Sequence, residues 1–303
     1  MTPTPVIISK QRLLLLFKMK IIKAHKITCP LDGLLLEQHD KQLVCDNGHA
    51  YDIARQGYVN LLPVQHKRSK QPGDSKAMVV ARTEFLNTGI YRPVVSSLTE
   101  LVSSLITDDK EICLLDAGCG EGYYFDEVFK VLKDKDGLSD VSFVGLDISK
   151  DAIIQATKRN RQISWLVGTN RQPPVADESV DIILCLFGFL SVEGFAKVLK
   201  PGGKIIFIDP GDEHLKELRE VIYDEVKISD QLNKLEEGIP GFSLVDNDSL
   251  QFKEKLISNE QVNNLLVMTP HFYRASKEGR QAACALQELE ITVDVVFRVF
   301  KKL

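Results

Sequence analysis

A short apolar run that ends in a glycine-rich turn restricts the fold of this chain more than any other feature. Residues Ile112 to Leu115 are apolar, and the turn Asp116-Ala-Gly-Cys-Gly-Glu-Gly122 follows directly. Further apolar runs come later, at Val141–Leu146, Ile163–Val167, Val180–Phe187 and Lys204–Ile208. Because roughly ten helix-compatible residues separate most of these runs, the pattern predicts an α/β fold with a parallel, doubly wound sheet that is covered on both faces.

Three elements are predicted outside this alternation. Leu289 to Val299 alternates and is rich in β-branched residues, which indicates a late strand that pairs antiparallel. Ser75 caps a predicted helix that runs to about Asn87, just before Gly89. A second helix is predicted from Pro93 to Leu105, with proline in its first turn.

The glycine turn carries the first functional signal. Gly118, Gly120 and Gly122 let the backbone approach a ligand where a Cβ would clash, at the carboxyl ends of the strands. The dinucleotide fingerprint G-x-G-x-x-G is not met, because Tyr123 stands three residues after Gly120. The turn resembles instead the first motif of Rossmann-like, class I S-adenosylmethionine-dependent methyltransferases, Asp/Glu-x-Gly-x-Gly-x-Gly.

The second strand ends in Asp147, 31 residues after the aspartate of the glycine turn. A carboxylate at this place accepts hydrogen bonds from ribose hydroxyls. The alternative is that Asp147 caps the next helix, in competition with Ser149. The resemblance also places Thr169 and Asn170 beside an adenine ring, and the turn Leu199-Lys-Pro-Gly-Gly203 is typical of the same superfamily.

The N-terminal segment 27–75 is turn-rich and too small to build its own core, so a metal or docking onto the body must stabilise it. Four of its residues have metal-ligand chemistry at a spacing close to that of zinc sites: Cys29, Asp32, Cys45 and His49. Asp32 stands where a second cysteine is usual, and His25 and His39 are alternative ligands. Two buried, unpaired cysteines and a surface histidine without metal are the remaining interpretation.

Charge is unevenly distributed along the chain. Residues 1–92 carry 14 lysines and arginines against 7 acidic residues, and the remainder carries 24 against 35. A basic front on an acidic body indicates a surface that binds a polyanion, the alternative being a solvated basic surface. In the loop Gln65–Lys70, His66, Lys67, Arg68 and Lys70 are expected to contact the phosphates of such a polyanion, so the affinity should fall with salt.

A longer block sharpens the functional prediction. The stretch Tyr51-Asp-Ile-Ala-Arg-Gln-Gly-Tyr-Val-Asn-Leu-Leu-Pro-Val-Gln-His-Lys-Arg-Ser69 resembles the 23S ribosomal RNA guanine-N1-methyltransferases of the RlmA family. Further matches, in a resemblance that runs from about residue 27 to the C-terminus, are Pro72-Gly-Asp-Ser75, Ala81-Arg82 with Phe85-Leu86, Gly89-Ile-Tyr91, the glycine turn through Tyr124, and Met268-Thr-Pro270.

The resemblance implies an enzyme that transfers a methyl group from S-adenosylmethionine to N1 of a guanine in a 23S rRNA hairpin. It also implies a homodimer and a zinc-ribbon-like module that grips the RNA. We expect an extension at 1–26, with Met19 an alternative start, the module and basic loop at 27–75, and a methyltransferase domain at 76–303. The residues expected to line the cofactor pocket are Tyr91, Asp116, Gly118, Gly120, Glu121, Gly122, Tyr123, Asp147, Thr169, Asn170 and His214.

The chain departs from the family after the strand at 180–187. Where the family commonly reads Tyr-Ala-Pro, this sequence has Phe187-Gly188-Phe189. Phe187 and Phe189 are expected to form the base pocket, with Tyr58 as a further aromatic, because a phenyl ring stacks on a base without the tyrosine hydroxyl. Guanine N1 carries a proton at neutral pH, so a general base must accept it. The candidate bases, which the sequence does not rank, are His214, Asp209 and Asp52.

Two other functions stay open at this point. One is a methyltransferase for a small molecule, against which the basic front and the block at 51–75 argue. The other is a protein that binds ribosomal RNA without catalysis. Six unevenly spaced cysteines do not resemble a disulfide framework, and no apolar run approaches the ~20 residues of a membrane helix, so we expect a cytoplasmic protein.

Overall fold

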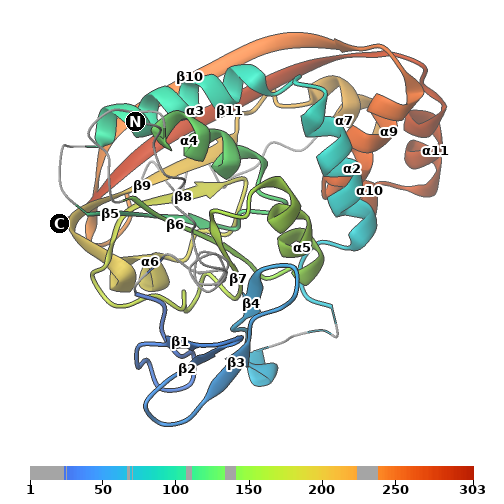
Figure 1. The fold of residues 1–303 in the computed structure, drawn as a ribbon. Coiled ribbons are helices and arrows are strands. Elements are labelled where there is room, and N and C mark those ends of the chain that lie inside the picture. The colour runs from blue at the N-terminus through green and yellow to red at the C-terminus, as the bar shows by residue number, and fades with distance from the viewer. Residues whose placement is uncertain are drawn as a thin grey trace, which may run out of the picture.

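The computed structural model describes residue 24 and residues 26–66, 69, 71–106, 111–133, 141–223 and 238–303. These residues form two sheets, and the larger has eight strands in the order β10-β11-β9-β8-β5-β6-β7-β4 (Figure 1). The strands of this sheet are β4 (Tyr58–Asn60), β5 (Ile112–Ala117), β6 (Val141–Asp147), β7 (Ser164–Val167), β8 (Val180–Leu186), β9 (Leu199–Pro210), β10 (Phe242–Leu256) and β11 (Leu289–Lys302).

The strands from β4 to β9 run parallel, and β11 runs antiparallel to both of its neighbours, β9 and β10. This confirms the predicted parallel sheet and the late antiparallel strand. The chain reverses its direction of travel across the sheet at β5, which lies between β6 and β8. A crevice for a ligand is therefore expected at the carboxyl ends of these three strands.

The start of β9 was predicted wrongly. The segment Leu199–Gly203 was expected to be a turn before a strand at Lys204, but β9 already begins at Leu199. Val180 of β8 pairs with Leu199 of β9, and Ile182 of β8 already pairs with Lys204, so β9 has three extra residues between the two pairs. The Pro-Gly-Gly segment is therefore an irregularity inside a longer strand.

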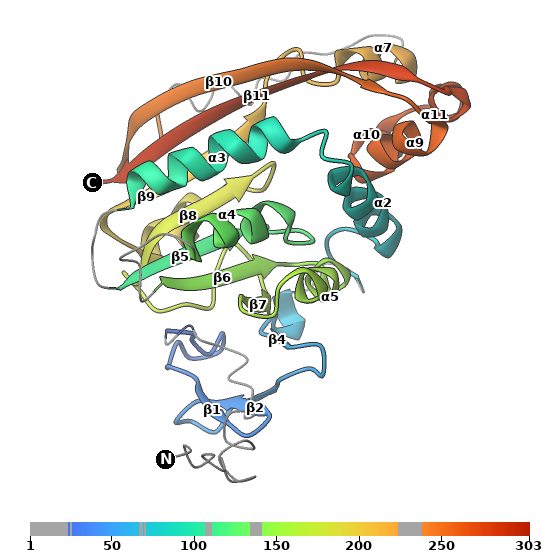
Figure 2. The ribbon, with the colours of Figure 1, turned by 45° about the horizontal axis from the view of Figure 1, so that its top comes forward.

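Helices cover both faces of the large sheet. In Figures 1 and 2, α3, α4 and α5 lie on one face and α6 lies on the other. The helices are α2 (Lys76–Asn87), α3 (Arg92–Leu105), α4 (Tyr123–Lys133), α5 (Lys150–Arg159), α6 (Val192–Val198), α7 (Lys216–Ile222), α9 (Asn259–Met268), α10 (His271–Arg274) and α11 (Lys277–Ala285). None of the described helices has the length and apolarity that crossing a membrane requires.

Two apolar clusters, one on each face, explain why the parallel strands are apolar throughout. On β5, Leu114 packs into the cluster that contains Phe125 of α4, while the next residue, Leu115, packs into the cluster that contains Phe195 of α6. Both faces of the strand are therefore buried. Ser75 caps α2 as predicted, since its Oγ accepts a hydrogen bond from the Met78 N–H at 3.4 Å.

The ring of Trp165 lies beneath the glycine turn. Gly145 on β6 is its partner across the strand pair, and a Cβ at Gly145 would overlap the indole. A Cβ at Gly122 would lie 2.8 Å from the same ring. The indole Nε1–H donates to the Asn160 carbonyl at 2.6 Å, which fixes the ring in place. Glycine at 122 and 145 therefore leaves room for the aromatic floor of the turn.

We expect Gly145→Ala to lower the free energy of unfolding by about 1–3 kcal/mol, because the added methyl overpacks the indole. Differential scanning calorimetry would show the loss as a lower Tm. Gly188→Ala is the matched control, since a Cβ there makes only ordinary contacts of 3.4–3.5 Å. In a Trp165→Leu background the cost of Gly145→Ala should shrink. Equal Tm values for the two alanine variants would contradict this account.

The N-terminal module docks onto the large sheet. Its own sheet contains β1 (Glu37–His39), β2 (Gln42–Val44) and β3 (Ala50–Asp52), all antiparallel. The next strand, β4, leaves this small sheet and pairs parallel with β7. The Thr28 N–H also donates to the Pro174 carbonyl at 2.9 Å. Backbone hydrogen bonds thus cross the predicted boundary at residue 75, and docking supplies the core that the module lacks.

Candidate active site and metal centre

The glycine turn is left-handed at three positions. Gly118, Gly120 and Gly122 have φ angles of +93°, +54° and +83°. The N–H groups of Gly118 and Cys119 donate to the Leu146 carbonyl at 2.8 and 3.0 Å, which ties the turn to β6. A Cβ at Gly118 or Gly120 would approach no atom closer than 3.5 Å. The space that these two glycines leave open is therefore available to a ligand, whereas Gly122 makes room for Trp165.

Asp147 joins the glycine turn to the following helix. Its Oδ2 accepts from the Gly120 N–H at 2.9 Å and its Oδ1 accepts from the Ser149 N–H at 2.7 Å. Ser149, not Asp147, caps α5, because its Oγ accepts from the Ala152 N–H at 3.3 Å. Each oxygen of Asp147 retains a lone pair, so the carboxylate fits the two hydroxyls of a ribose. Burial raises the pKa of Asp147, and burial together with the charge of Asp147 raises that of Asp116.

An aromatic cluster closes the same end of the sheet. The Phe187 ring stacks on His214 with ring centroids 6.1 Å apart, and the Tyr91 and Tyr124 rings lie 6.3 Å from His214 and 6.2 Å from Phe187, respectively. Phe187 holds a left-handed φ of 51°, a costly conformation that its N–H supports by donating to the Ile208 carbonyl at 2.8 Å. The structure thus brings together three residues that the sequence singled out separately.

Hydrogen bonds fix the tautomer of His214. The Asp294 N–H donates to His214 Nδ1 at 3.2 Å, so Nδ1 is an acceptor and the neutral ring carries its proton on Nε2. That Nε2–H points to Tyr91 Oη at 3.3 Å. Burial lowers the pKa of His214 to about 4, so the ring is neutral at physiological pH. Neither ring nitrogen is then free to accept another proton.

Asp209 is a buried carboxylate at the carboxyl end of β9. Among the residues that the structure describes, its Oδ2 has no hydrogen-bond partner. The nearby Arg298 on β11 is 2% exposed, and its Nε and Nη1 are also without partners. Burial raises the pKa of Asp209 to about 6, although the Arg298 charge opposes the shift. Asp209 follows Ile208 on β9, and the Ile208 carbonyl accepts from the Phe187 N–H at 2.8 Å.

Other predicted site residues have structural contacts of their own. Glu121 is buried in an ion pair with Arg159, which lies 5.2 Å from the Tyr123 ring centroid. Asn170 Nδ2 donates to the carbonyls of Ala117 at 3.2 Å and Phe189 at 3.0 Å, and so joins the β5 and β8 loops. Thr169 accepts from the Arg171 N–H at 3.3 Å.

Two predicted residues lie away from the cluster around the glycine turn. Asp52 belongs to the small sheet, where its carboxylate accepts from Gln42 Nε2 at 2.8 Å. Tyr58 is buried in β4 and presents no face on which an RNA base can stack. Of the predicted phosphate-binding residues, Lys67, Arg68 and Lys70 fall outside the described residues, and His66 lies in a short 3-10 helix at Val64–His66.

Sequence reasoning missed the role of Arg82. Its guanidinium forms an ion pair with Asp74 and donates to the Met268 carbonyl at 2.9 Å. One terminal nitrogen lies 3.5 Å from where a Cβ of Gly120 would be. The Asp74 carbonyl accepts from Ser149 Oγ at 2.8 Å. The motifs around residues 74, 82 and 268, which the resemblance grouped without a role, therefore converge on the glycine turn.

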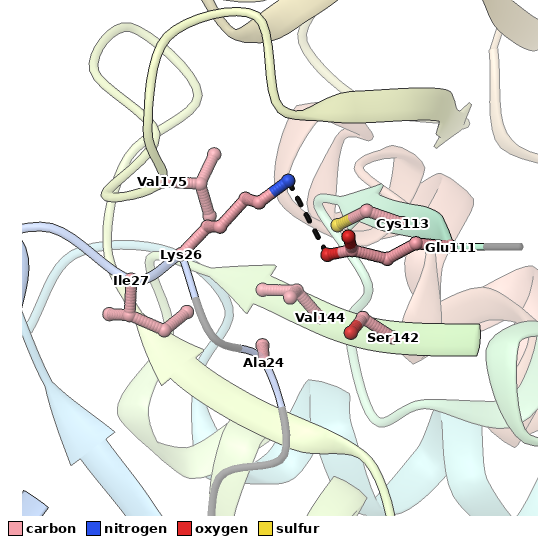
Figure 3. Close-up of a pocket in the computed structure, with 8 residues that line it drawn as sticks. All are labelled: Ala24, Lys26, Ile27, Glu111, Cys113, Ser142, Val144 and Val175. Carbon is pink, nitrogen blue, oxygen red and sulfur yellow. Dashed lines mark ion pairs between the residues drawn. The ribbon is translucent and has the colours of Figure 1, made fainter. Parts of the chain in front are cut away.

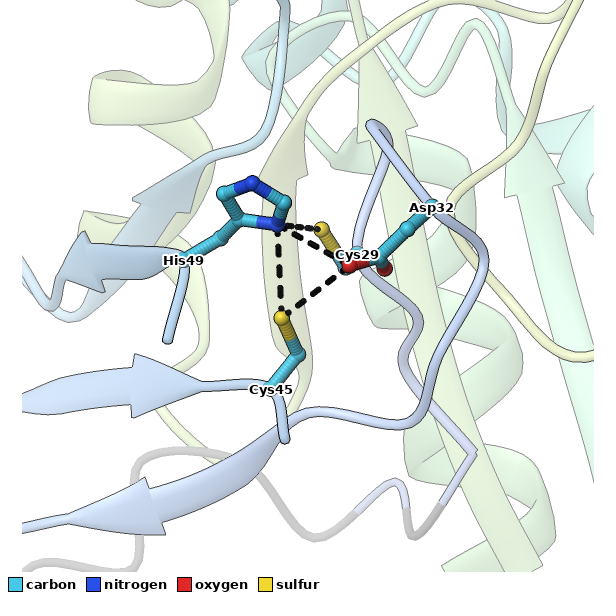
Figure 4. A group of neighbouring side chains, drawn as sticks. All are labelled: Cys29, Asp32, Cys45 and His49. Atoms are coloured by element: carbon cyan, nitrogen blue, oxygen red, sulfur yellow. Dashed lines mark hydrogen bonds and ion pairs between the residues drawn. The ribbon is translucent and has the colours of Figure 1, made fainter. Parts of the chain in front are cut away.

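The four candidate metal ligands meet in the N-terminal module, as Figure 4 shows. Their ligand atoms all lie within 4.8 Å of one another: those of Cys29, Asp32, Cys45 and His49. His49 Nδ1 is 3.5 Å from Cys29 Sγ, 3.4 Å from Cys45 Sγ and 3.0 Å from Asp32 Oδ2. Tetrahedral zinc with such ligands requires separations of about 3.3–3.8 Å, so the two thiol–imidazole distances fit, and the imidazole and carboxylate atoms would move slightly apart around a metal ion. The alternative ligand His39 lies instead near Glu37 on the exposed strand β1.

A small pocket at the amino ends of the parallel strands does not belong to the candidate active site. It is lined by Cys113 and Ser142, at the amino ends of β5 and β6, and by the ion pair of Lys26 and Glu111 at 3.4 Å (Figure 3). The glycine turn lies at the carboxyl ends of the same strands. The pocket is therefore separated from the candidate active site by the length of the sheet.

Comparisons with known proteins agree with this arrangement. A family model described as "RlmA, N-terminal", a zinc ribbon, matches residues 27–70, and a methyltransferase domain model matches residues 115–207. The 23S rRNA (guanine(748)-N(1))-methyltransferase of Streptomyces fradiae is 27% identical over 289 residues, covering 91% of this chain and 97% of that protein. A putative 23S rRNA (guanine-N(1)-)-methyltransferase of Micromonospora griseorubida is 32% identical over 209 residues, covering 63% of this chain and 68% of that protein. Among solved structures, YcgJ of Bacillus subtilis aligns with a TM-score of 0.43 at 18% identity, covering 67% of this chain and 97% of that one.

The sheet order, the glycine turn and the matched domains define a Rossmann-like, S-adenosylmethionine-dependent methyltransferase with an N-terminal zinc ribbon. Within that class, the chain belongs to the RlmA family of 23S rRNA (guanine-N1)-methyltransferases.

Proposed function

We propose that this protein methylates N1 of a guanine in a 23S rRNA hairpin, and that it acts as a homodimer in the cytoplasm. One observation carries the proposal: relatives named for this reaction align over as much as 91% of the chain, ribbon included. A small-molecule methyltransferase needs no ribbon. The open glycine turn and the acid Asp147 argue against a protein that only binds RNA.

The direct test is methylation of 23S rRNA by the purified protein. We expect methyl transfer from S-adenosylmethionine to an rRNA fragment, followed by detection of 1-methylguanosine by mass spectrometry after nuclease digestion. Ribosomal RNA from cells without the gene should lack the same mark. Methylation of a metabolite in the absence of RNA, or cofactor binding without any RNA methylation, would contradict the proposal.

When bound, S-adenosylmethionine supplies an activated methyl group on its sulfonium. The residues of this chain have the remaining tasks. Gly118 and Gly120 admit the ligand to the backbone, and Asp147 accepts hydrogen bonds from the ribose hydroxyls. The target guanine must leave its stack to reach the pocket. Phe187, stacked on His214, offers it an aromatic surface and helps to exclude water.

Among the three candidates, we propose Asp209 as the general base. His214 has its Nδ1 lone pair occupied and its Nε2 protonated, and Asp52 belongs to the small sheet. Asp209 is buried at the carboxyl end of β9, one residue after the carbonyl that holds the Phe187 N–H, and its Oδ2 has no partner among the described residues. With a pKa raised to about 6, the carboxylate is ionised at neutral pH yet more basic than an exposed aspartate.

We further propose that Cys29, Asp32, Cys45 and His49 hold zinc. Although burial alone would raise it, hydrogen bonds from the Leu34 N–H, Cys29 and Asn47 keep the pKa of Asp32 below its usual range. The carboxylate is therefore ionised, as a ligand must be. The metal would stabilise the turns of the ribbon, which presents the RNA-binding face.

A cobalt titration tests the metal centre. We expect one Co²⁺ per chain, with a thiolate charge-transfer band, and zinc in the protein as purified. Asp32→Ala should lower the affinity for the metal by at least about 10–100-fold, which is the usual loss when a residue that only hydrogen-bonds to a metal ligand is removed. Asp46→Ala, an exposed neighbour of Cys45, is the matched control. Equal metal affinity of both variants would show that Asp32 is not a ligand.

A further inference from the structure

An exposed aromatic ring beside the active site has a cation stacked on it. Phe189, two residues after Phe187, is 58% exposed. The guanidinium carbon of Arg171 lies 5.2 Å from the centroid of its ring. Arg171 is itself exposed and forms no ion pair with a described residue. The pair therefore presents an aromatic surface and an uncompensated positive charge to the solvent.

The backbone around this pair is held by side chains. Asn170 Nδ2 donates to the Phe189 carbonyl at 3.0 Å, and the Arg171 N–H donates to Thr169 Oγ1 at 3.3 Å. The neighbouring Gln172 Nε2 donates to the Pro30 carbonyl at 3.2 Å, which connects the same loop to the N-terminal module. Arg171 and Phe189 thus lie on a fixed surface between the zinc ribbon and the active site.

The position fits a nucleotide adjacent to the target. Two residues of chain span at most about 7 Å, so the Cα atoms of Phe187 and Phe189 are separated by no more than about the distance between neighbouring nucleotides of an RNA strand. Phe187 contacts the aromatic cluster, whereas Phe189 contacts only Arg171 among the described rings and cations. Single-stranded RNA is bound by aromatic rings that stack on bases and by arginines that contact phosphates.

We propose that Arg171 and Phe189 form a stacking platform for an unpaired RNA nucleotide next to the target guanine. Phe187 then serves the target base, and Phe189 serves its neighbour. This inference rests on the proposed RNA substrate and assigns one of the two predicted pocket residues to a separate task. Holding the neighbouring base away from the target would keep the guanine unstacked, so the platform contributes to RNA affinity and not to the chemical step.

The test combines a protein change with an RNA change. The dissociation constant of a 23S rRNA hairpin is measured by fluorescence anisotropy for the wild type, Phe189→Ala and Phe189→Trp. Base–aromatic stacking contributes enough that Phe189→Ala should weaken binding between about 5-fold and 150-fold, while Phe189→Trp restores it. An abasic site next to the target guanine should cost the wild type a similar factor and cost Phe189→Ala nothing further.

Kinetics and salt dependence separate this role from others. Phe189→Ala should raise KM with kcat unchanged, whereas Phe187→Ala should lower kcat. Arg171→Gln should reduce the slope of log affinity against log salt by roughly 0.7–0.9, as expected for one phosphate contact. Calorimetric affinity for S-adenosylmethionine should stay at the wild-type value in the Phe189 and Arg171 variants.

The outcomes distinguish this inference from the proposed function. If the wild type neither binds nor methylates the rRNA, the function itself is wrong. If the wild type does both and Phe189→Ala binds as tightly, or an abasic neighbour still weakens that variant, the platform is wrong. Loss of kcat in Phe189→Ala without a change in KM would place Phe189 on the target base instead.

Discussion

Replacing Asp209 by Asn should lower kcat by about 10²–10⁴-fold, the usual contribution of a positioned general base. The substitution keeps the size of the side chain and removes its ability to accept the proton of guanine N1. Affinity for S-adenosylmethionine and for the hairpin should stay within a few-fold, because in the proposed arrangement Asp209 contacts only N1 of the target guanine. Single-turnover methylation of a 23S rRNA fragment measures the effect directly.

Folding must be checked, because Asn at position 209 leaves the buried Arg298 without its counter-charge. A Tm measured alongside the rate separates loss of structure from loss of chemistry. Asp212→Asn is the matched control, since Asp212 is an exposed aspartate three residues further along, just after β9 ends. It should leave both kcat and Tm unchanged.

The pH dependence gives the role of Asp209 an independent signature. A general base works only when deprotonated, so the wild-type rate should rise with pH through about 6 and then level off. In Asp209→Asn that step should disappear, and the residual rate should climb in alkaline solution as guanine N1 ionises unaided. If the variant retained the step near pH 6, another group would be the base.

The parts of the fold that the sequence predicted are those that depend on neighbours along the chain. The strands β5 to β9 are buried on both faces and read as apolar runs, and Ser75 marks the start of α2 by its own hydrogen bond. The 15-residue strand β10 was missed, because most of its residues are exposed at the edge of the sheet and show no alternation. The three-residue strand β4 was missed because only its pairing with β7 makes it a strand.

The candidate site likewise contains residues that a local sequence signal predicted and residues that no local signal could predict. Asp147 was predicted because it ends a strand, and the metal ligands were predicted from spacing. Tyr91 and His214 came only from the resemblance. The residue that orients His214 is Asp294, 80 positions later, and its backbone N–H carries no sequence signal at all. Arg82 reaches the glycine turn from a separate helix, so only the folded chain shows that the two meet.

Loss of the Asp147 carboxylate should weaken cofactor binding by roughly 10²-fold or more. Two hydrogen bonds from ribose hydroxyls to a charged acceptor contribute about 1.5–3 kcal/mol each, and every 1.4 kcal/mol is about tenfold in affinity. Asp147→Asn keeps the shape but removes the charge and one of the accepting oxygens. Isothermal titration calorimetry with S-adenosylmethionine measures the change, and Asp151→Asn, in the first turn of α5, is the matched control.

The pH dependence of this affinity follows from the raised pKa of Asp147. The ionised carboxylate is the better acceptor for a ribose hydroxyl, so affinity should fall as the solution is acidified through the raised pKa. Asp147→Asn should show no such fall. Because the Gly120 N–H also donates to Asp147, removal of the carboxylate loosens the glycine turn as well. Asp147→Asn should therefore bind 5′-methylthioadenosine, which lacks the amino-acid tail, more weakly, just as it binds the full cofactor more weakly. Wild-type affinity of Asp147→Asn for both ligands would mean that the nucleoside binds elsewhere than at the carboxyl ends of β5 and β6.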